Sequence, residues 1–254
     1  MRTATKNKNK FVLTLMFTII IILTLVVVVL VAALMKRPAE EIDPHEGQVY
    51  INDGFGMVWM TPLEGVDVNN ISQSDIVRYD GVPKYVGEGY ETLRGVDVSE
   101  HQYDIDWAAV AASGVDFAYI RLGYRGYTQG GLFEDAYFKA NIEGAKSNGI
   151  KVGVYFFSQA INVQEAIEEA DFVLERIEQY DIDLHVMYDW EKMEEAGADA
   201  RTYQLDTAIL DECAVAFCET VKKAGYEPGV YFNRYIGYYG FDLSRLNSYK
   251  FWLA

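Results

Sequence analysis

From residue 93 onward, short apolar runs alternate with longer segments of helical periodicity. The uninterrupted apolar runs are typical of strands that are buried on both faces. Strands and helices that alternate in this way form parallel β/α units. The expected elements are strand 95–99, helix 105–114, strand 117–122, helix 133–148, strand 151–157, helix 162–180, strand 184–189, helix 202–224, strand 229–232 and strand 249–254.

A (β/α) barrel of the TIM-like type is the first expectation for this α/β pattern, and an open doubly wound sheet is the second. No Gly-x-Gly-x-x-Gly motif follows the first strand, so a nucleotide-binding fold has no support. Six strands are expected, whereas a complete barrel has eight. We therefore expect a fragment of a longer gene product, truncated after about six strands and not necessarily active as it stands.

The expected strand 184–189 runs into two carboxylates, Asp189 and Glu191, with Trp190 between them. Side chains alternate along a strand, so both carboxylates should lie on one side and Trp190 on the other. Two neighbouring carboxylates can push their pKa values apart, so that one stays protonated while the other stays charged. Glycoside hydrolysis uses such a pair. The alternative interpretation is a strand that ends in an acidic surface loop.

Other residues suited to a site also fall near the carboxyl ends of expected strands, where barrel enzymes carry their chemistry. They are Asp97, Arg121, Tyr155 and Tyr231. This coincidence favours the catalytic interpretation of the acid pair.

Several motifs occur in this region in a fixed order. They are Gly95-Val96-Asp97-Val98-Ser99-Glu100-His101-Gln102, Ile105-Asp106-Trp107, Asp116-Phe117-Ala118-Tyr119-Ile120-Arg121, Gly153-Val154-Tyr155-Phe156-Phe157 and Tyr188-Asp189-Trp190-Glu191. With these motifs, residues 93–254 resemble glycoside hydrolase family 25, the lysozyme-like muramidases. Asp67 occurs in a heptapeptide similar to that around Asp97, but only Asp97 is followed by the other motifs.

The resemblance implies a distorted β/α barrel, no metal and no cofactor, and cleavage of the β-1,4 bond between N-acetylmuramic acid and N-acetylglucosamine in peptidoglycan. It implies that Glu191 is the general acid that protonates the leaving oxygen. Asp189 would stabilise positive charge at the sugar, or hold the substrate's own acetamido group as the nucleophile. Asp97 would orient or help to polarise the site.

A sugar site also needs aromatic faces and polar edges. Tyr155 and Tyr231 are the first candidates to line the groove, although either could face the core instead. Further candidates for substrate binding are Tyr124, Trp252, Arg121 and Asn233. Arg121 is more typical of a structural partner for an acid, and Asn233 follows a strand and could hydrogen-bond a sugar hydroxyl.

The first 45 residues predict a membrane anchor. A basic tail at 1–10 precedes an uncharged apolar segment at 11–35, which as a helix is about 37 Å long. Four basic residues precede this segment and only Lys36 and Arg37 follow it, so the N-terminus should be cytoplasmic and the rest extracellular. A cleaved signal peptide is the alternative. A linker at 36–45 and a small β-rich segment at 46–92, with a hairpin around residues 52–56, should follow.

Beyond residue 37 the chain has 16 basic and 38 acidic residues, a net charge of −22. This excess disfavours nucleic acid as a partner, because phosphate binding needs clustered Lys and Arg. Cys213 and Cys218 are expected to be buried and unbridged. Two alternatives to a muramidase remain, a non-catalytic wall-binding protein on the same fold and a chitinase-like glycosidase. The anchor favours turnover of the cell's own wall.

Overall fold

The computed structural model describes residues 2–35, 43–67, 69–193 and 196–254. The chain divides into two compact units, Met1–Gly47 and Gln48–Ala254. In the first unit, helix α1 (Arg2–Met35) takes in the expected basic tail, and its part Lys10–Met35 is long and apolar enough to cross a membrane. A signal sequence near an N-terminus meets the same criteria. Most of the expected linker, residues 36–42 with Lys36 and Arg37, lies outside the described residues.

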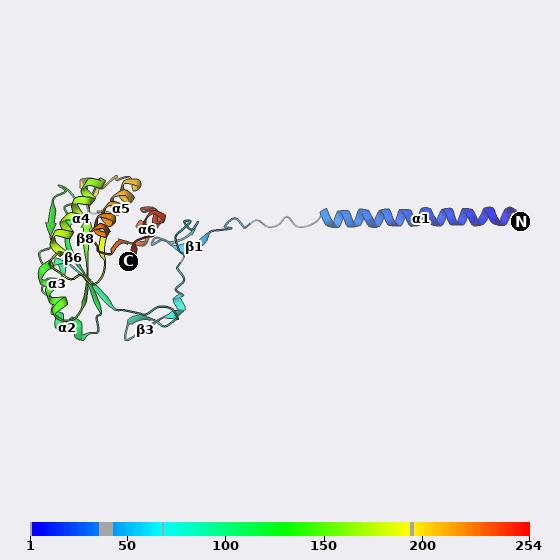
Figure 1. Ribbon diagram of the computed structural model, residues 1–254. Coiled ribbons are helices and arrows are strands. Elements are labelled where there is room, and N and C mark those ends of the chain that lie inside the picture. Colours follow the sequence, from blue (N-terminus) through cyan, green and yellow to red (C-terminus); the bar gives the residue numbers. More distant parts are fainter. Residues whose placement is uncertain (1, 36–42, 68, 194–195) are drawn as a thin grey trace. The chain divides into compact units, whose positions relative to one another are not determined.

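A seven-stranded sheet forms the centre of the second unit (Figure 1). Six of its strands are parallel neighbours in the order β11-β10-β9-β8-β6-β5, and β7 (Leu132–Glu134) pairs antiparallel with β6. The parallel strands are β5 (Gly95–Val98), β6 (Phe117–Arg125), β8 (Lys151–Ser158), β9 (Val186–Trp190), β10 (Pro228–Phe232) and β11 (Lys250–Leu253). All six strands expected from the sequence are therefore present.

Helices connect these strands and cover the outer face of the sheet (Figure 1). They are α2 (Trp107–Ala112), α3 (Phe138–Ser147), α4 (Val163–Ile177), α5 (Thr207–Lys223), α6 (Arg234–Tyr239) and α7 (Leu243–Leu246). Most begin at an Asp or Asn whose side chain accepts a hydrogen bond from a backbone N–H of the first turn, as Asp106, Asn162 and Asp206 do. Such caps fix where each helix starts.

Two expected helices start five residues later than predicted. The helix expected at 133–148 begins at Phe138, because Phe133 and its neighbours pair with the last residues of β6 as strand β7. The helix expected from residue 202 begins at Thr207, because Asp206 supplies its N-terminal cap. In both cases a local partner, which periodicity does not reveal, sets the helix start.

Successive side chains of the central strands point to opposite faces of the sheet. One face is wholly buried beneath the helices, where Phe156 packs on Phe172 of α4 and Tyr188 packs on Phe217 of α5. Cys213 and Cys218 of α5 belong to this core and are free thiols, as expected. The other face carries tyrosines and acids, so the polar chemistry lies on the side away from the helices.

The sheet is strongly curled. In a flat sheet, β6 and β11 would be four strand spacings apart, or about 19 Å. Yet Trp252 of β11 stacks on Tyr119 of β6 with ring centroids 4.9 Å apart. The polar face is therefore the concave one, and the fold is an α/β fold with a curled, half-barrel-like parallel sheet.

Two small hairpins lie in the described part of residues 48–92. Strands β1 (Val49–Asn52) and β2 (Met57–Met60) pair antiparallel, which confirms the hairpin expected around residues 52–56. Strands β3 (Ile76–Tyr79) and β4 (Val82–Tyr85) form the second hairpin. Within the described part of this segment, Asp53 is the one buried residue, so the segment has no core of its own.

Candidate active site

The acid pair lies where strand alternation predicts. Asp189 of β9 is in register with Tyr231 of β10 and Phe157 of β8, on the concave face. Trp190 instead lies in the core beneath the helices. Glu191 follows β9 directly and is half-buried, whereas Asp189 is only 5% exposed. Both carboxylates thus lie at the carboxyl end of a central strand.

Asp97 comes from β5, the far end of the sheet, and its charge acts on both of these acids. Burial raises the pKa of Glu191, and the charge of Asp97 raises it further. The pKa of Asp189 is raised well above its ordinary range, first by burial and then by Glu191, with Arg121 opposing and Asp97 adding. The curl of the sheet therefore gathers the three acids predicted from the sequence into one electrostatic site.

Asp189 is unusual because its Oδ1 atom is buried without a hydrogen-bond partner in the described part of the chain. An unpartnered buried carboxylate oxygen is costly when charged. Asp189 and Glu191 together therefore favour holding a proton. A hydrogen-bond donor on a bound molecule could supply the partner that Asp189 Oδ1 lacks.

Two predicted tyrosines form walls on either side of β9. Tyr231 of β10 has a pKa raised to about 12 by burial, and Glu191, Asp189 and Asp97 contribute in that order. Burial also raises the pKa of Tyr155 of β8, with Asp189 and Asp97 again adding to the rise. Both hydroxyls therefore stay neutral near pH 7 and share the space of the acids.

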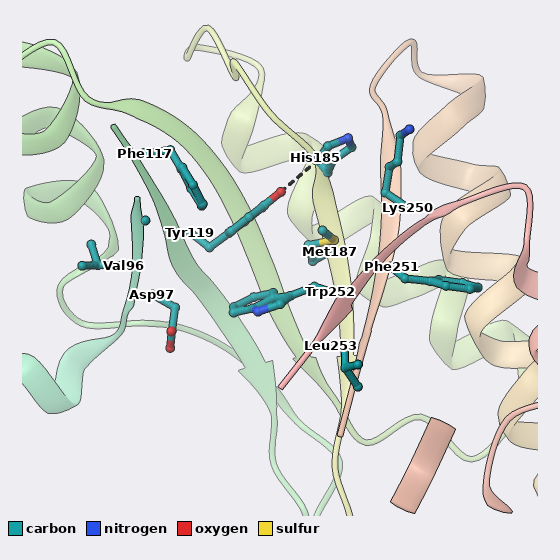
Figure 2. Close-up of a pocket in the computed structure, with 11 residues that line it drawn as sticks. Val96, Asp97, Phe117, Tyr119, His185, Met187, Lys250, Phe251, Trp252 and Leu253 are labelled. Atoms are coloured by element: carbon teal, nitrogen blue, oxygen red, sulfur yellow. Dashed lines mark hydrogen bonds between the residues drawn. The ribbon is translucent and has the colours of Figure 1, made fainter. Parts of the chain in front are cut away.

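Trp252 fills the middle of the concave face. Its ring lies 4.9 Å from Tyr119, 5.0 Å from Tyr231 and 5.9 Å from Tyr155 between centroids. It borders a cavity of about 360 Å³ that extends from Asp97 along the inside of the curl to His185 (Figure 2). Most of the indole surface is thus used in packing among tyrosines.

Arg121 is engaged by acids that sequence reasoning did not single out. Its Nε atom donates to Asp135 at 2.7 Å, and its guanidinium pairs with Glu100 at 3.1 Å. Asp135 also accepts from the backbone N–H of Glu100, so the group fixes the turn that follows Asp97. The guanidinium lies over the ring of Tyr124, which also stacks on Phe133. The structure thus places Arg121 and Tyr124 together, beside the site.

Asn233 has a local role that the sequence prediction did not anticipate. Its Oδ1 atom accepts from the N–H of Ile236 at 2.9 Å and caps helix α6. This cap leaves only the Nδ2 group for a sugar hydroxyl.

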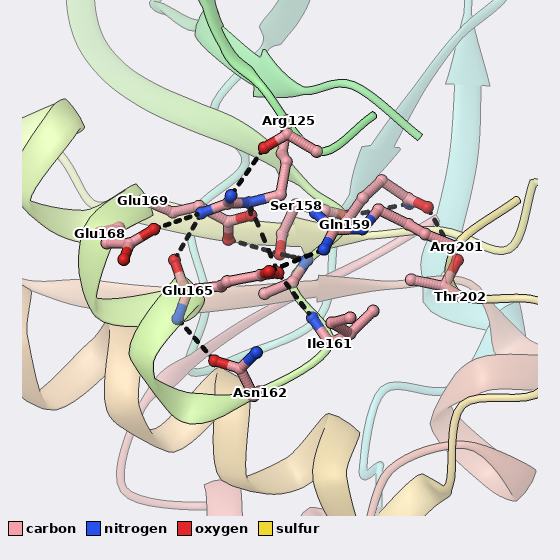
Figure 3. Close-up of polar contacts among 12 residues, drawn as sticks. Arg125, Ser158, Gln159, Ile161, Asn162, Glu165, Glu168, Glu169, Arg201 and Thr202 are labelled. Carbon is pink, nitrogen blue, oxygen red and sulfur yellow. Dashed lines mark hydrogen bonds and ion pairs between the residues drawn. The ribbon is translucent and has the colours of Figure 1, made fainter. Parts of the chain in front are cut away.

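Gln159 is a support that sequence reasoning missed (Figure 3). It is wholly buried one residue after β8, and its Nε2 group donates to the backbone carbonyls of Ser158 and Glu191, both at 2.9 Å. Its Oε1 atom accepts from Thr202 at 2.8 Å. Gln159 therefore fixes the backbone that carries Glu191, and no motif marks it because its partners are distant in sequence.

Behind Gln159 lies a buried ionic group (Figure 3). Glu169 of α4 accepts from Arg125 Nε and from Ser158 Oγ, each at 2.6 Å. Burial raises the pKa of Glu169 to about 7, although Ser158 and Arg125 oppose the rise. The group ties the end of β6 to helix α4 and to the end of β8.

Across the described ranges, no cluster of three or more His, Cys, Asp or Glu side chains is arranged to hold a metal ion.

Comparison with known proteins adds an independent finding. The family model described as "Glycosyl hydrolases family 25" matches residues 96–254. Lysozyme M1 of Streptomyces globisporus is 35% identical over 80 residues, which are 32% of this chain and 25% of that protein. The chain thus spans about a quarter of the length of that curated relative.

Solved structures share the fold. The modular autolysin LytC of Streptococcus pneumoniae, solved in complex with a synthetic peptidoglycan ligand, is 26% identical with a TM-score of 0.50, and the match covers 75% of this chain and 43% of LytC. A family 25 glycosyl hydrolase from Bacillus anthracis is 21% identical with a TM-score of 0.52, over 64% of this chain and 70% of that one.

Proposed function

The chain belongs to glycosyl hydrolase family 25, and on that basis we propose that it is a muramidase, cleaving the β-1,4 bond between N-acetylmuramic acid and N-acetylglucosamine in peptidoglycan. The observation that carries the proposal is the acid pair Asp189 and Glu191 facing Asp97 on a concave, tyrosine-walled surface. The peptidoglycan ligand in the LytC structure supports the substrate class.

In the proposed reaction, Glu191 protonates the leaving oxygen. Its pKa, raised by burial, keeps the proton available nearer neutral pH than an exposed glutamate would. It is also more exposed than Asp189, so it is the carboxyl that a glycosidic oxygen meets first. While Glu191 holds the proton of the pair, the deeper Asp189 is the charged partner, which stabilises the positive charge that develops at the sugar or holds the substrate's acetamido group for attack. Asp97 polarises the site from the opposite side.

The substrate would lie against the predicted binding residues. Tyr155 and Tyr231 offer ring edges and neutral hydroxyls on either side of the acids. Trp252 forms the floor between these tyrosines, Tyr124 and Arg121 lie beside the site, and the Asn233 Nδ2 group is available for a hydroxyl of the sugar.

We also propose that the curled sheet is part of a (β/α) barrel of the TIM type, with residues 93–254 as the catalytic domain. The stacking of Trp252 on Tyr119 across the sheet supports this curvature. An experimental structure of the protein in which the sheet is flat, with β5 and β11 far apart, would contradict it.

The proposed location is the cell membrane, with α1 as a single-pass anchor, the N-terminus in the cytoplasm and the catalytic domain outside. The length and composition of Lys10–Met35 support a span. An anchored hydrolase would act on the cell's own wall.

The direct test is release of new reducing ends from purified peptidoglycan, with chitin as the comparison polymer. The parent should act on peptidoglycan and much less on chitin. Glu191→Gln should reduce the rate by about 10²- to 10⁴-fold, because the general acid is lost, while Glu143→Gln, at an exposed position on α3, should not. A folded protein that binds wall and never cuts it would instead support a binding module.

A further inference from the structure

An aromatic surface lies beside the site and is not used by the mechanism above. It consists of Phe55, in the β1–β2 turn, and Tyr235, Tyr238 and Tyr239 of α6, and we refer to it as the aromatic shelf. The four rings form a continuous row, with centroid distances of 5.5 Å from Phe55 to Tyr235, 5.1 Å from Tyr235 to Tyr239 and 6.5 Å from Tyr239 to Tyr238.

The shelf is exposed although it is built from large rings. Phe55 is 83% exposed, and the three tyrosines are between 40% and 45% exposed. Contiguous exposed aromatic groups usually mark a binding surface, because leaving them in water costs free energy. The exposed rings therefore indicate a binding surface.

The turn that carries Phe55 is held on α6 by a specific anchor. Asp53 is only 6% exposed, and its Oδ1 atom accepts from the backbone N–H groups of Phe55 and Gly56. Its Oδ2 atom accepts from the Tyr239 hydroxyl at 2.8 Å. A second link, from Asn247 Nδ2 to the Gly65 carbonyl at 2.8 Å, ties the same segment to the end of α7. The β-rich segment thus contributes a fixed ring to the shelf.

The position of the shelf indicates what it binds. Asn233 alone separates β10 from α6, so the shelf follows the carboxyl end of β10, on the same rim as Asp189 and Glu191. Tyr231, which faces the acids, precedes Tyr235 by only four positions in the sequence. A polymeric substrate that leaves the acids along this rim would run over the shelf.

The chemistry of the shelf selects among possible occupants. Sugar rings have apolar C–H faces and polar edges, and tyrosines pair a flat apolar face with a hydroxyl. The net charge of −22 beyond residue 37 disfavours an anionic lipid surface. We propose that the aromatic shelf is an additional binding surface for the peptidoglycan glycan strand, outside the cleavage site. This inference rests on the proposed substrate class.

The test measures binding without cleavage. In the full chain carrying Glu191→Gln, the association constants for a tetrasaccharide fragment and for long uncrosslinked glycan strands are compared. Phe55→Ala and Tyr238→Ala should each lower the ratio of long-chain to short-chain affinity by about three- to tenfold, the size of one aromatic contact. Tyr79→Ala is the control, because Tyr79 is 61% exposed on the other hairpin.

An unchanged ratio in both shelf variants would overturn the inference. Self-association that Phe55→Ala abolishes, with the ratio unchanged, would also overturn it and assign the shelf to a second copy of the chain. The two proposals fail separately. A chain that cuts peptidoglycan with an unchanged ratio keeps its function and loses the shelf, while one that binds long strands but never cuts loses only the muramidase function.

Discussion

Asp189 belongs to the proposed catalytic pair, and its burial destabilises the folded chain. Its carboxyl is buried, one oxygen has no partner within the described residues, and its pKa is raised mainly by burial. A folded-state pKa above the unfolded value means that the folded chain holds this proton more tightly. The contribution of the Asp189 carboxyl to stability is therefore complete below its pKa in the unfolded chain. That contribution is lost as the pH rises through its pKa in the folded chain.

We predict that Asp189→Asn raises the free energy of unfolding at pH 7 by about 1–3 kcal/mol, because an amide needs neither a buried charge nor the uptake of a proton on folding. The gain should shrink as the pH falls towards 4, where the parent carboxyl is itself neutral. Denaturant unfolding at several pH values measures this, with Asp199→Asn at an exposed position as the control. A variant that is less stable at pH 7, with a pH-independent difference, would contradict the argument. Glycan cleavage should be lost in the same variant.

At this scale the sequence predicts the acids but not their supports. Asp189 and Glu191 are adjacent on a strand of known period, so their shared side follows from the sequence. Gln159 and Glu191 are 32 positions apart, and the Arg121–Asp135 pair joins a strand to a segment that reads as a helix. Such contacts depend on tertiary structure, which no local pattern specifies.

Among the elements, α6 is short and depends on its cap. Asn233 is a cap through Oδ1 and also a predicted sugar ligand through Nδ2, and substitutions can separate the two roles. Asn233→Ala should lower the free energy of unfolding by about 1 kcal/mol because the cap is lost.

Asn233→Asp keeps the capping oxygen and removes the Nδ2 donor. It should therefore match the parent in thermal unfolding while raising the KM for glycan. Unfolding curves and substrate titrations on the two variants measure both effects. If Asn233→Asp leaves KM unchanged, Asn233 is only a cap.

The elements themselves were largely predictable. All six parallel strands and the main helices follow from apolar runs and periodicity. The first residues of α3 (Phe138) and α5 (Thr207) could not be predicted in this way, because strand β7 and the Asp206 cap set them locally. The curl of the sheet favours the expected barrel over the open doubly wound sheet. Strand and helix alternation alone allowed both, since curl depends on the twist accumulated over all strands.

For the whole molecule, the N-terminal helix determines where the enzyme would work. We predict that the full chain stays in the membrane pellet after an alkaline carbonate wash, and that external protease removes the catalytic domain from intact cells. Lys10–Met35 should hold it there. Recovery of the protein in the medium with a shortened N-terminus would show a cleaved signal sequence instead.

The acids on the concave face are proposed to cleave one particular bond of peptidoglycan. The decisive measurement is to digest purified peptidoglycan with the protein, reduce the new ends with borohydride and identify them by mass spectrometry. A muramidase should yield reduced N-acetylmuramic acid ends, and these should disappear in Glu191→Gln. Reduced N-acetylglucosamine ends, or no new ends from a folded and wall-bound protein, would contradict it.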